Sequence, residues 1–190
     1  MCHRFLTNPN FLLLLLAIDQ DIAEKVRADG CHCGGRLHVA NFPRKPRGGP
    51  NGPGAKLHLR MSFCCDADNC RRRRTPPSTR FLDHRVYLGI IVVLITALHQ
   101  GTRPKSYARL QRTFGVDRRT IARWQKWWTV SFPSSDFWKI ARARFVRLPE
   151  PLELPRTLVR LFRPPSTGMI GLLRFLSPIG TSERFQLQVF

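Results

Sequence analysis

The chain of 190 residues carries a formal net charge of +20 at pH 7, because 32 Lys and Arg face only 12 Asp and Glu. Hydrophobic residues make up 43% of it, which is enough to bury a core, so the composition excludes a wholly disordered chain. Since the basic residues are clustered, the charge favours binding to a polyanion over a role in solubility alone. Nucleic acid is preferred to a membrane surface as that polyanion, because no basic amphipathic helix stands out.

The N-terminal segment predicts a helix from about Pro9 to Arg27, with Asn8 as its cap. The apolar run 11–18 resembles a short signal sequence, and a secreted protein is the alternative to a packed helix. Acidic residues follow the run at once, and no cleavage site of small residues is present. The run is also shorter than the roughly 18 residues that a membrane span requires. We therefore expect a helix that packs against the rest of the chain.

Two segments in the cysteine-containing region predict β-strands. Residues 36–40 and 57–63 alternate apolar and polar side chains, and the second segment places Arg60 and Ser62 on its outer face. The stretch 43–54 between them is rich in Pro and Gly and predicts a loop. The result is a β-hairpin with a long basic tip. Its core is too small to be stable alone, so a metal ion would supply much of its folding free energy.

The cysteine spacing favours a metal site. Structural zinc takes four thiolate or imidazole ligands, usually as two close pairs from two turns. His32 and His38 are substitutes if Cys33 points away, and free buried cysteines or a disulfide are the alternatives to a metal. The expected ligands of a structural Zn2+ are Cys31, Cys33, Cys65 and Cys70, with Cys64 as the alternate ligand.

The second half of the chain predicts helices. Residues 75–82 predict a linker, because paired prolines stiffen an extended segment. The apolar run 86–98 predicts a buried helix, although its β-branched content leaves a buried strand as the alternative. Two short helices follow at 106–114 and 117–128, and Gly115 stands where the first would end in a left-handed residue. This order is typical of a helix-turn-helix.

The second of these helices would place Ile121, Trp124 and Trp128 inward and cations outward, as a helix in the major groove requires. An αα-hairpin whose arginines are merely solvated is the alternative. The expected DNA contacts of this helix are Arg118, Arg119, Arg123 and Lys126. Phosphate contacts from the preceding turn and helix are expected from Arg103, Lys105, Arg109 and Arg112. A second basic patch, for a minor-groove or single-strand contact, comprises Arg44, Lys45, Arg47, Arg71, Arg72, Arg73 and Arg74.

The C-terminal part predicts further helices and no active site. The stretch 131–135 interrupts the helical pattern, a helix is expected at 138–146, and two apolar stretches at 158–162 and 169–176 predict two more. A nuclease could use His38 or His58 with Asp66 and Asp68. Two acids between cysteine ligands more simply solvate a turn, so no catalytic residue is assigned and no enzyme is expected.

With these motifs the chain resembles the DNA-recognition segments of bacterial insertion-sequence transposases and their short accessory proteins, in which a zinc ribbon precedes a helix-turn-helix. The matching residues are Cys31 to Gly35, Cys65, Cys70 to Pro77 and Phe114 to Trp124. The resemblance covers roughly residues 30–128. It implies binding to element-end DNA, with Arg118, Arg119 and Arg123 at the readout positions. It does not extend to catalysis, because too few carboxylates follow the helix-turn-helix for an RNase H-like domain.

The expected fold is α+β, a small zinc-ribbon hairpin joined to a helix-turn-helix domain with extra C-terminal helices. The expected divisions are an N-terminal helix (1–29), the hairpin with its basic loop (30–74), a linker (75–82), the helix-turn-helix domain (83–130) and a C-terminal helical region (131–190). We expect a cytoplasmic, nucleoid-associated bacterial protein that binds double-stranded DNA sequence-specifically as an accessory protein or regulator of a mobile element. Its protein partner would be a transposase or a second copy, with no membrane and no small-molecule substrate. The alternative is an RNA-binding or ribosome-associated zinc-ribbon protein.

Overall fold

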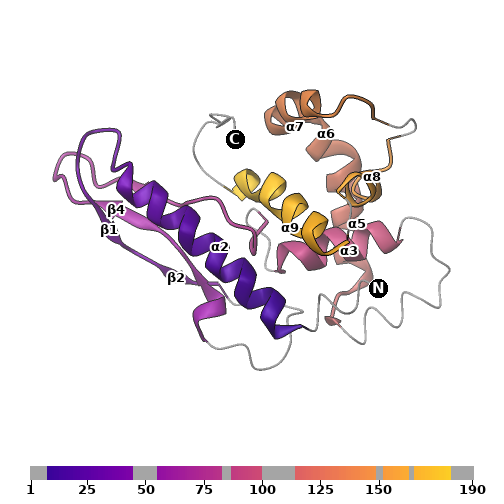
Figure 1. Cartoon of the computed structure of the whole chain (residues 1–190), viewed down its shortest axis with the longest axis horizontal. Helices are drawn as coiled ribbons and strands as arrows, with labels where there is room; N and C mark the ends of the chain where they lie inside the picture. Colours follow the sequence, from indigo (N-terminus) through magenta and orange to yellow (C-terminus); the bar gives the residue numbers. More distant parts are fainter. Residues whose placement is uncertain are drawn as a thin grey trace.

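The computed structural model describes residues 8–44, 55–82, 87–99, 114–148, 152–162 and 165–180. The fold combines helices with short antiparallel strands and is of the mixed α+β kind, as predicted. One long helix, α2 (Pro9–Ala28), lies between a β-hairpin and the remaining helices (Figure 1).

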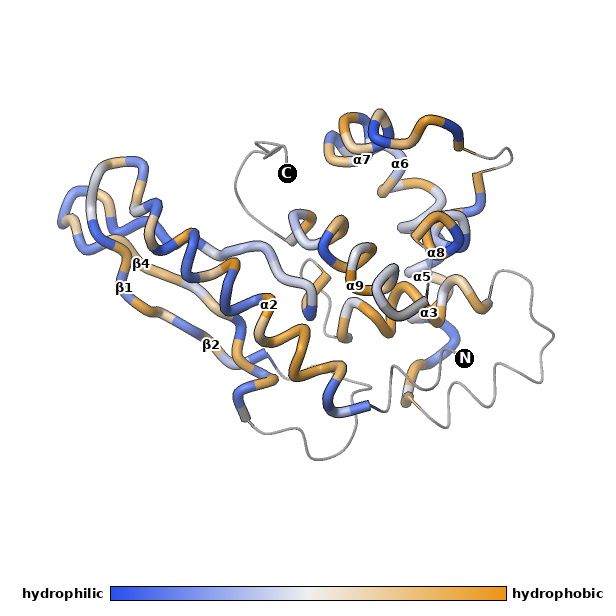
Figure 2. Tube along the Cα trace, in the orientation of Figure 1, coloured by the Kyte–Doolittle hydropathy of each residue, from blue (hydrophilic) through white to orange (hydrophobic). Residues whose placement is uncertain are grey.

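Helix α2 begins as the sequence predicts. Asn8 is the cap, and its side-chain oxygen accepts a hydrogen bond from the Asn10 backbone N–H at 3.0 Å. The apolar run packs inward through five buried side chains in the first half of the helix, which Figure 2 shows as hydrophobic. These side chains are Phe11, Leu12, Leu15, Leu16 and Ile18. Among the described residues, no helix combines the length and the apolar character that crossing a bilayer requires.

The predicted hairpin forms in two short ladders. Strand β1 (Leu37–Val39) pairs with β4 (Phe63–Cys65), and β2 (Phe42–Pro43) pairs with β3 (Leu59–Arg60), all antiparallel. Both ladders have the same register: Leu37 pairs with Cys65 at one end and Pro43 pairs with Leu59 at the other, so the two strands span equal numbers of residues between these pairs. They are two parts of a single bent hairpin.

A third strand, β5 (Arg73–Arg74), pairs with β4 and completes a sheet of order β1-β4-β5. The arginine run, predicted only as a charged segment, is therefore partly an edge strand. Its backbone also bonds outside the ladder, since the Cys65 N–H donates to the Arg72 carbonyl at 3.0 Å.

The expected alternation of residues 57–63 is confirmed only at its two ends, where Leu57 and Phe63 are buried. Leu57 lies in a 3-10 turn, η1 (Ala55–His58), while Arg60 and Ser62, expected outside, are both buried. The hairpin bends between the two ladders, where the Ser62 N–H donates to the Asn41 side chain at 3.0 Å. The Arg60 guanidinium in turn donates to the Pro76 carbonyl at 2.5 Å. The segment around Pro76, which follows β5, therefore packs over the face of the hairpin that was expected to be exposed.

Residues 78–82, the later part of the segment expected as a linker, are packed into the structure. Ser78, Thr79, Arg80, Phe81 and Leu82 are all buried. Phe81 and Leu82 join the same hydrophobic core as the first half of α2 and the helices that follow. Residues 78–82 of the expected linker are therefore a packed part of the interior.

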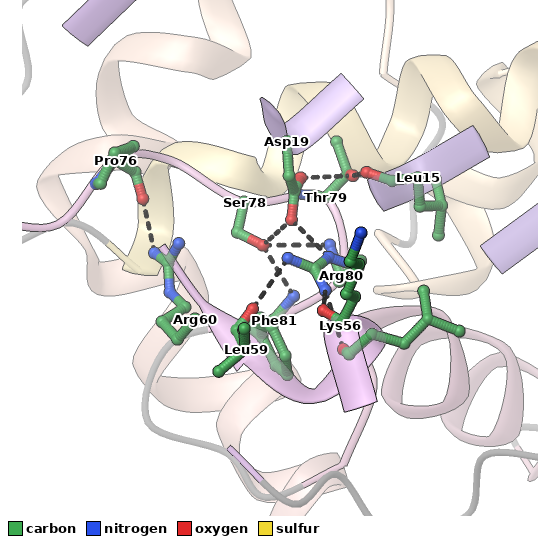
Figure 3. A network of polar contacts seen from close by, with 11 residues as sticks. Leu15, Asp19, Lys56, Leu59, Arg60, Pro76, Ser78, Thr79, Arg80 and Phe81 are labelled. Carbon is green, nitrogen blue, oxygen red and sulfur yellow. Dashed lines mark hydrogen bonds and ion pairs between the residues drawn. The ribbon is translucent and has the colours of Figure 1, made fainter. Parts of the chain in front are cut away.

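Asp19 of α2 holds this segment in place (Figure 3). Its carboxylate accepts hydrogen bonds from the Ser78 hydroxyl and from the Thr79 backbone N–H at 2.6 Å. The Arg80 guanidinium donates to the same carboxylate at 2.8 Å, and the side chains of this ion pair are 1% and 2% exposed. Charge and hydrogen-bond pairing are what make such burial tolerable.

Arg80 also reaches the hairpin. Its Nη1 donates to the Leu57 carbonyl at 2.7 Å and its Nη2 to the Leu59 carbonyl at 3.0 Å, so one side chain ties α2 to the hairpin (Figure 3). Arg60 lies nearby, and burial lowers its pKa to about 10 despite the opposing effect of Asp19.

Nine further helical segments follow among the described residues. The first, α3 (Gly89–His99), is buried along most of its length, as its apolar run predicts, and contacts α5 and α8. The others are α5 (Arg118–Lys126), η2 (Trp127–Ser131), α6 (Phe132–Ser134), α7 (Asp136–Ala141), η3 (Arg142–Arg144), α8 (Arg156–Leu161), α9 (Pro165–Leu176) and the closing 3-10 turn η4 (Ser177–Gly180). The first helix of the expected helix-turn-helix lies outside the described residues except for Phe114.

Two boundaries differ from the prediction. The interruption expected within 131–135 falls at its last residue, Ser135, whose backbone is extended, because a π-helical segment, η2 (Trp127–Ser131), continues α5 directly into α6. This segment allows Trp128 and Phe132 both to be buried, with ring centroids 4.7 Å apart. The helix expected to run to Val146 ends at Ala141 and gives way to a 3-10 turn, η3 (Arg142–Arg144).

Candidate metal centre and basic helix face

Four cysteine sulfurs converge at the base of the hairpin. Cys31 and Cys70 have Sγ atoms 3.7 Å apart, Cys33 and Cys65 have Sγ atoms 3.5 Å apart, and all four lie within 4.8 Å of one another. A disulfide bond is about 2 Å long, so none of these pairs is bonded. A tetrahedron of metal–sulfur bonds of about 2.3 Å has sulfur–sulfur edges of about 3.8 Å. The arrangement could therefore hold a metal ion.

The end of α2 delivers the first pair. Gly30 follows the helix with φ +70°, a left-handed conformation that turns the chain away from the helix axis. The Gly34 N–H then donates to the Cys31 carbonyl at 2.8 Å, and the Cys31 N–H donates to the Gly35 carbonyl at 3.0 Å. These bonds fold the loop tightly enough for Cys31 and Cys33 to face the same point.

Strand β4 and the turn after it deliver the second pair. Cys65 ends the strand and is buried, and the Cys70 N–H donates to the Ala67 carbonyl at 2.9 Å to close the turn. The two loops touch at Gly35, where an added Cβ would lie 2.5 Å from the Cys65 Sγ. Only glycine allows this approach.

Asp66 locks the two loops together. Its Oδ1 accepts from the Arg36 N–H at 2.8 Å, and its own N–H donates to the Arg36 carbonyl at 3.0 Å. His38 Nε2 lies 3.4 Å from the other carboxylate oxygen, on an exposed side chain. Asp68 instead pairs with Arg71. Asp66 and Asp68, the two acids considered for a nuclease, thus both make contacts within the cysteine-containing loops.

The four thiols do not ionise independently. A hydrogen bond from the Gly35 backbone, with help from the neighbouring thiols, lowers the pKa of the exposed Cys33 to about 7. For Cys65, the Ala67 backbone lowers the pKa, but burial and the neighbouring thiols outweigh it and raise the pKa to about 12. The pKa of Cys70 is also raised: the Arg72 backbone lowers it, but Cys33 and burial outweigh that effect. A bound cation would favour the thiolate form of all four, because it supplies the charge that they lack.

The four cysteines predicted as the principal ligands are therefore the four that meet. Cys64, the alternate, is outside the cluster, with its Sγ 3.5 Å from the Arg71 carbonyl. His32 and His38 are not among the grouped side chains either, since Cys33 points inward to Cys65.

The described arginines of the predicted second basic patch differ in their contacts within the protein. Arg71 pairs with Asp68, the Arg74 guanidinium donates to the Gly30 carbonyl, and the Arg73 guanidinium lies 5.6 Å from the centre of the Phe42 ring. Arg72 is exposed. Arg44 lies 6.0 Å from the centre of the Phe81 ring. Lys45 and Arg47 are outside the described residues.

Helix α5 matches its prediction closely. Asp117 caps it by accepting from the Thr120 N–H at 2.7 Å, and Gly115 before it has φ +62°. Tyr87 stabilises this turn. Its hydroxyl donates a hydrogen bond to the Gly115 carbonyl at 3.3 Å, and its ring packs edge-on against Trp124 with the ring centroids 5.0 Å apart.

The two sides of α5 differ sharply. Ile121 and Trp124 of α5 are buried, and Trp128 of η2 continues this inner stripe. The four predicted cations are all exposed on the opposite side: Arg118, Arg119, Arg123 and Lys126. The phosphate contacts expected from Arg103, Lys105, Arg109 and Arg112 are outside the described residues.

Sequence reasoning missed the junction built on Asp19 and Arg80. No local motif announces it, because its members come from α2, the hairpin and the segment after the hairpin. The one available signal is the acidic residue that comes directly after the apolar run, the first of three within six positions.

Comparison with models of known protein families, with curated proteins and with solved structures gave no match.

Proposed function

We propose that this protein binds double-stranded DNA through α5 and that its four cysteines hold a structural zinc ion. The observation that carries the proposal is the exposed face of α5, with four cations opposite a fully buried apolar stripe. A helix of this kind can lie in the major groove, where Arg side chains reach base edges and flanking phosphates. The overall charge of +20 supports a polyanionic partner.

Zinc is the metal that best suits the cysteine cluster. Four thiolates in a tetrahedral arrangement select a soft or borderline ion and leave no open coordination position for a substrate. The role is structural, since the site joins the end of α2, strand β4 and the turn before β5. On this view zinc holds the hairpin, and α5 contacts the nucleic acid. A role as a transposase-related accessory protein or regulator of a mobile element belongs to the same proposal and rests on the resemblance of the motifs.

Binding to labelled duplex DNA at several salt concentrations tests the proposal. We expect the affinity to fall steeply with salt, by about one power of salt concentration for each phosphate neutralised. Arg119→Ala should reduce the preference between duplex sequences, whereas Arg72→Ala should weaken binding to all duplexes alike. Arg27 is an exposed arginine in the last turn of α2, and Arg27→Ala is the matched control. It should change neither the affinity for duplex DNA nor the preference between sequences.

Competition distinguishes the alternative function. A structured RNA that displaces the duplex at equal concentration, with no effect of Arg119→Ala on RNA binding, would identify an RNA-binding protein instead. Absence of zinc from the purified, folded protein would contradict the metal assignment. The proposal of DNA binding by α5 would be unaffected by that result.

A further inference from the structure

Three side chains at the start of α5 form a connected chain of hydrogen bonds. The Thr120 hydroxyl lies 2.8 Å from Asp117 Oδ2, and Arg123 Nη2 lies 2.9 Å from the Thr120 hydroxyl. Thr120 is buried, while Asp117 and Arg123 are exposed. The chain therefore runs from the helix cap, through a fixed hydroxyl, to an exposed guanidinium.

The direction of each bond follows from the groups involved. A threonine hydroxyl has one hydrogen, and an ionised carboxylate can only accept, so Thr120 donates to Asp117. A guanidinium can only donate, so Arg123 donates to a lone pair of the same hydroxyl. The Asp117 carboxylate also accepts from the Thr120 N–H at 2.7 Å, which holds the acceptor end still. The single hydrogen of the hydroxyl is thus committed to Asp117, and one of its lone pairs is directed at Arg123.

Arg123 is distinguished by this contact from its neighbours. Thr120 is its hydrogen-bond partner among the described residues, and no comparable side-chain contact orients Arg118, Arg119 or Lys126 within the described part of the chain. Helical side chains lean toward the N-terminus, so the guanidinium of Arg123 lies over the first turn of the helix. One of its five N–H groups is used and the rest remain for a ligand.

We infer that Thr120 is a positioning residue that aims Arg123 at a guanine edge in the major groove. This inference rests on the proposed function and names the base that the helix reads. A guanine offers O6 and N7 to a guanidinium in one planar geometry, so its recognition depends on direction. A phosphate tolerates a flexible cation, and the unrestrained Lys126 is suited to it. Holding Arg123 before binding removes the entropy cost of ordering that side chain in the complex.

The test begins with selection of preferred sequences by the full-length wild-type protein from duplexes with a randomised centre. Binding to the selected duplex and to each of its single base-pair changes is then measured for wild type, Thr120→Val, Thr120→Ser and Arg123→Ala. Val keeps the size of Thr120 without the hydroxyl, and Ser restores the hydroxyl. We expect Thr120→Val to lose about threefold to tenfold of the discrimination at one G·C pair, the ordering cost of one long side chain. Arg123→Ala should lose the discrimination at that same pair entirely, and Thr120→Ser should retain it.

A merely structural role would leave a different pattern. Loss of discrimination spread over all positions, together with a lowered melting temperature, would overturn the inference, as would wild-type discrimination by Thr120→Val. An unchanged dependence of affinity on salt for Thr120→Val is expected, because no phosphate contact is removed. If the wild-type protein selects no sequence at all, the proposed DNA reading by α5 fails first, so the two failures can be told apart.

Discussion

At the scale of single residues, the metal centre depends on positions that are not ligands. Gly35 lies so close to Cys65 that a side chain there would displace the sulfur, and Asp66 joins the two loops through the backbone of Arg36. Residues that orient the ligands of a metal site typically contribute about 10–100-fold to metal affinity.

Replacing Gly35 by Ala should weaken zinc binding. The added Cβ would lie 2.5 Å from the Cys65 Sγ, and because the neighbouring atoms belong to the ligand loop, the ligand must move. We expect a loss of affinity of about tenfold or more, as for other residues that orient metal ligands. Competition with a coloured zinc chelator measures it, and an unchanged affinity would show that the loop adapts.

Two adjacent cysteines give the sharpest test of the ligand set. Cys65 is in the cluster, whereas Cys64 is outside it. Cys65→Ser should abolish stoichiometric zinc binding, and Cys64→Ser should retain one zinc per chain, as measured by metal analysis of the purified proteins. The opposite result would mean that β4 is shifted by one residue, since adjacent strand residues face opposite sides.

The buried ion pair is a second point at which a single atom change has a large effect. Asp19→Asn keeps the shape of the side chain but leaves the Arg80 charge buried without its partner. We expect a loss of about 3–5 kcal/mol in the free energy of unfolding, measured with urea. Asp21→Asn, on the exposed side of the same helix, is the control and should cost little. Equal effects of the two substitutions would show that the pair contributes nothing.

At the scale of elements, α2 serves two cores. Its first half packs into the large hydrophobic core, while Ala23 in its second half packs with Leu37 and Phe63 of the hairpin around the cysteines. The apolar run that resembles a signal sequence is thus the part of α2 that anchors it to the other helices.

Neighbouring leucines in that run should respond differently to substitution. Leu15 is completely buried, whereas Leu14 is 45% exposed. Leu15→Ala should lower the free energy of unfolding by about 2–5 kcal/mol, because it removes packed methyl groups and leaves a cavity. Leu14→Ala should cost much less. If a urea titration gives similar losses of unfolding free energy for the two variants, α2 is rotated about its axis relative to the structure described.

At the scale of the whole molecule, the metal centre and the tryptophans report on different parts. The cysteines belong to the small hairpin core, and all four tryptophans lie between residues 124 and 138, on the other side of α2. Metal removal with a chelator should therefore make the hairpin susceptible to protease while tryptophan fluorescence stays unchanged. A red shift of the emission that accompanies zinc release would show that the two cores unfold together.

The predictable parts of this fold are those specified by short-range patterns. The caps Asn8 and Asp117, the buried stripe of α5 and the two cysteine pairs each involve residues within a few positions of one another, and all were identified from spacing. The bend of the hairpin was not predictable, because the burial of Arg60 depends on a carbonyl at Pro76. Paired prolines indicate a linker because they stiffen the chain in an extended conformation. Whether other parts of the protein pack over such an extended segment depends on tertiary structure, which the local sequence does not specify.

The buried contacts of Asp19 also set an order of events during synthesis. Its described partners all come from Ser78–Arg80, and Thr79 follows it by 60 residues. At a rate of roughly 5–20 residues per second, a ribosome takes about 3–12 s to make that interval. During this time the apolar side of α2 has emerged without Phe81, Leu82 or α3 to cover it. We therefore expect the nascent chain to pass through a period in which α2 can bind chaperones that recognise exposed apolar segments.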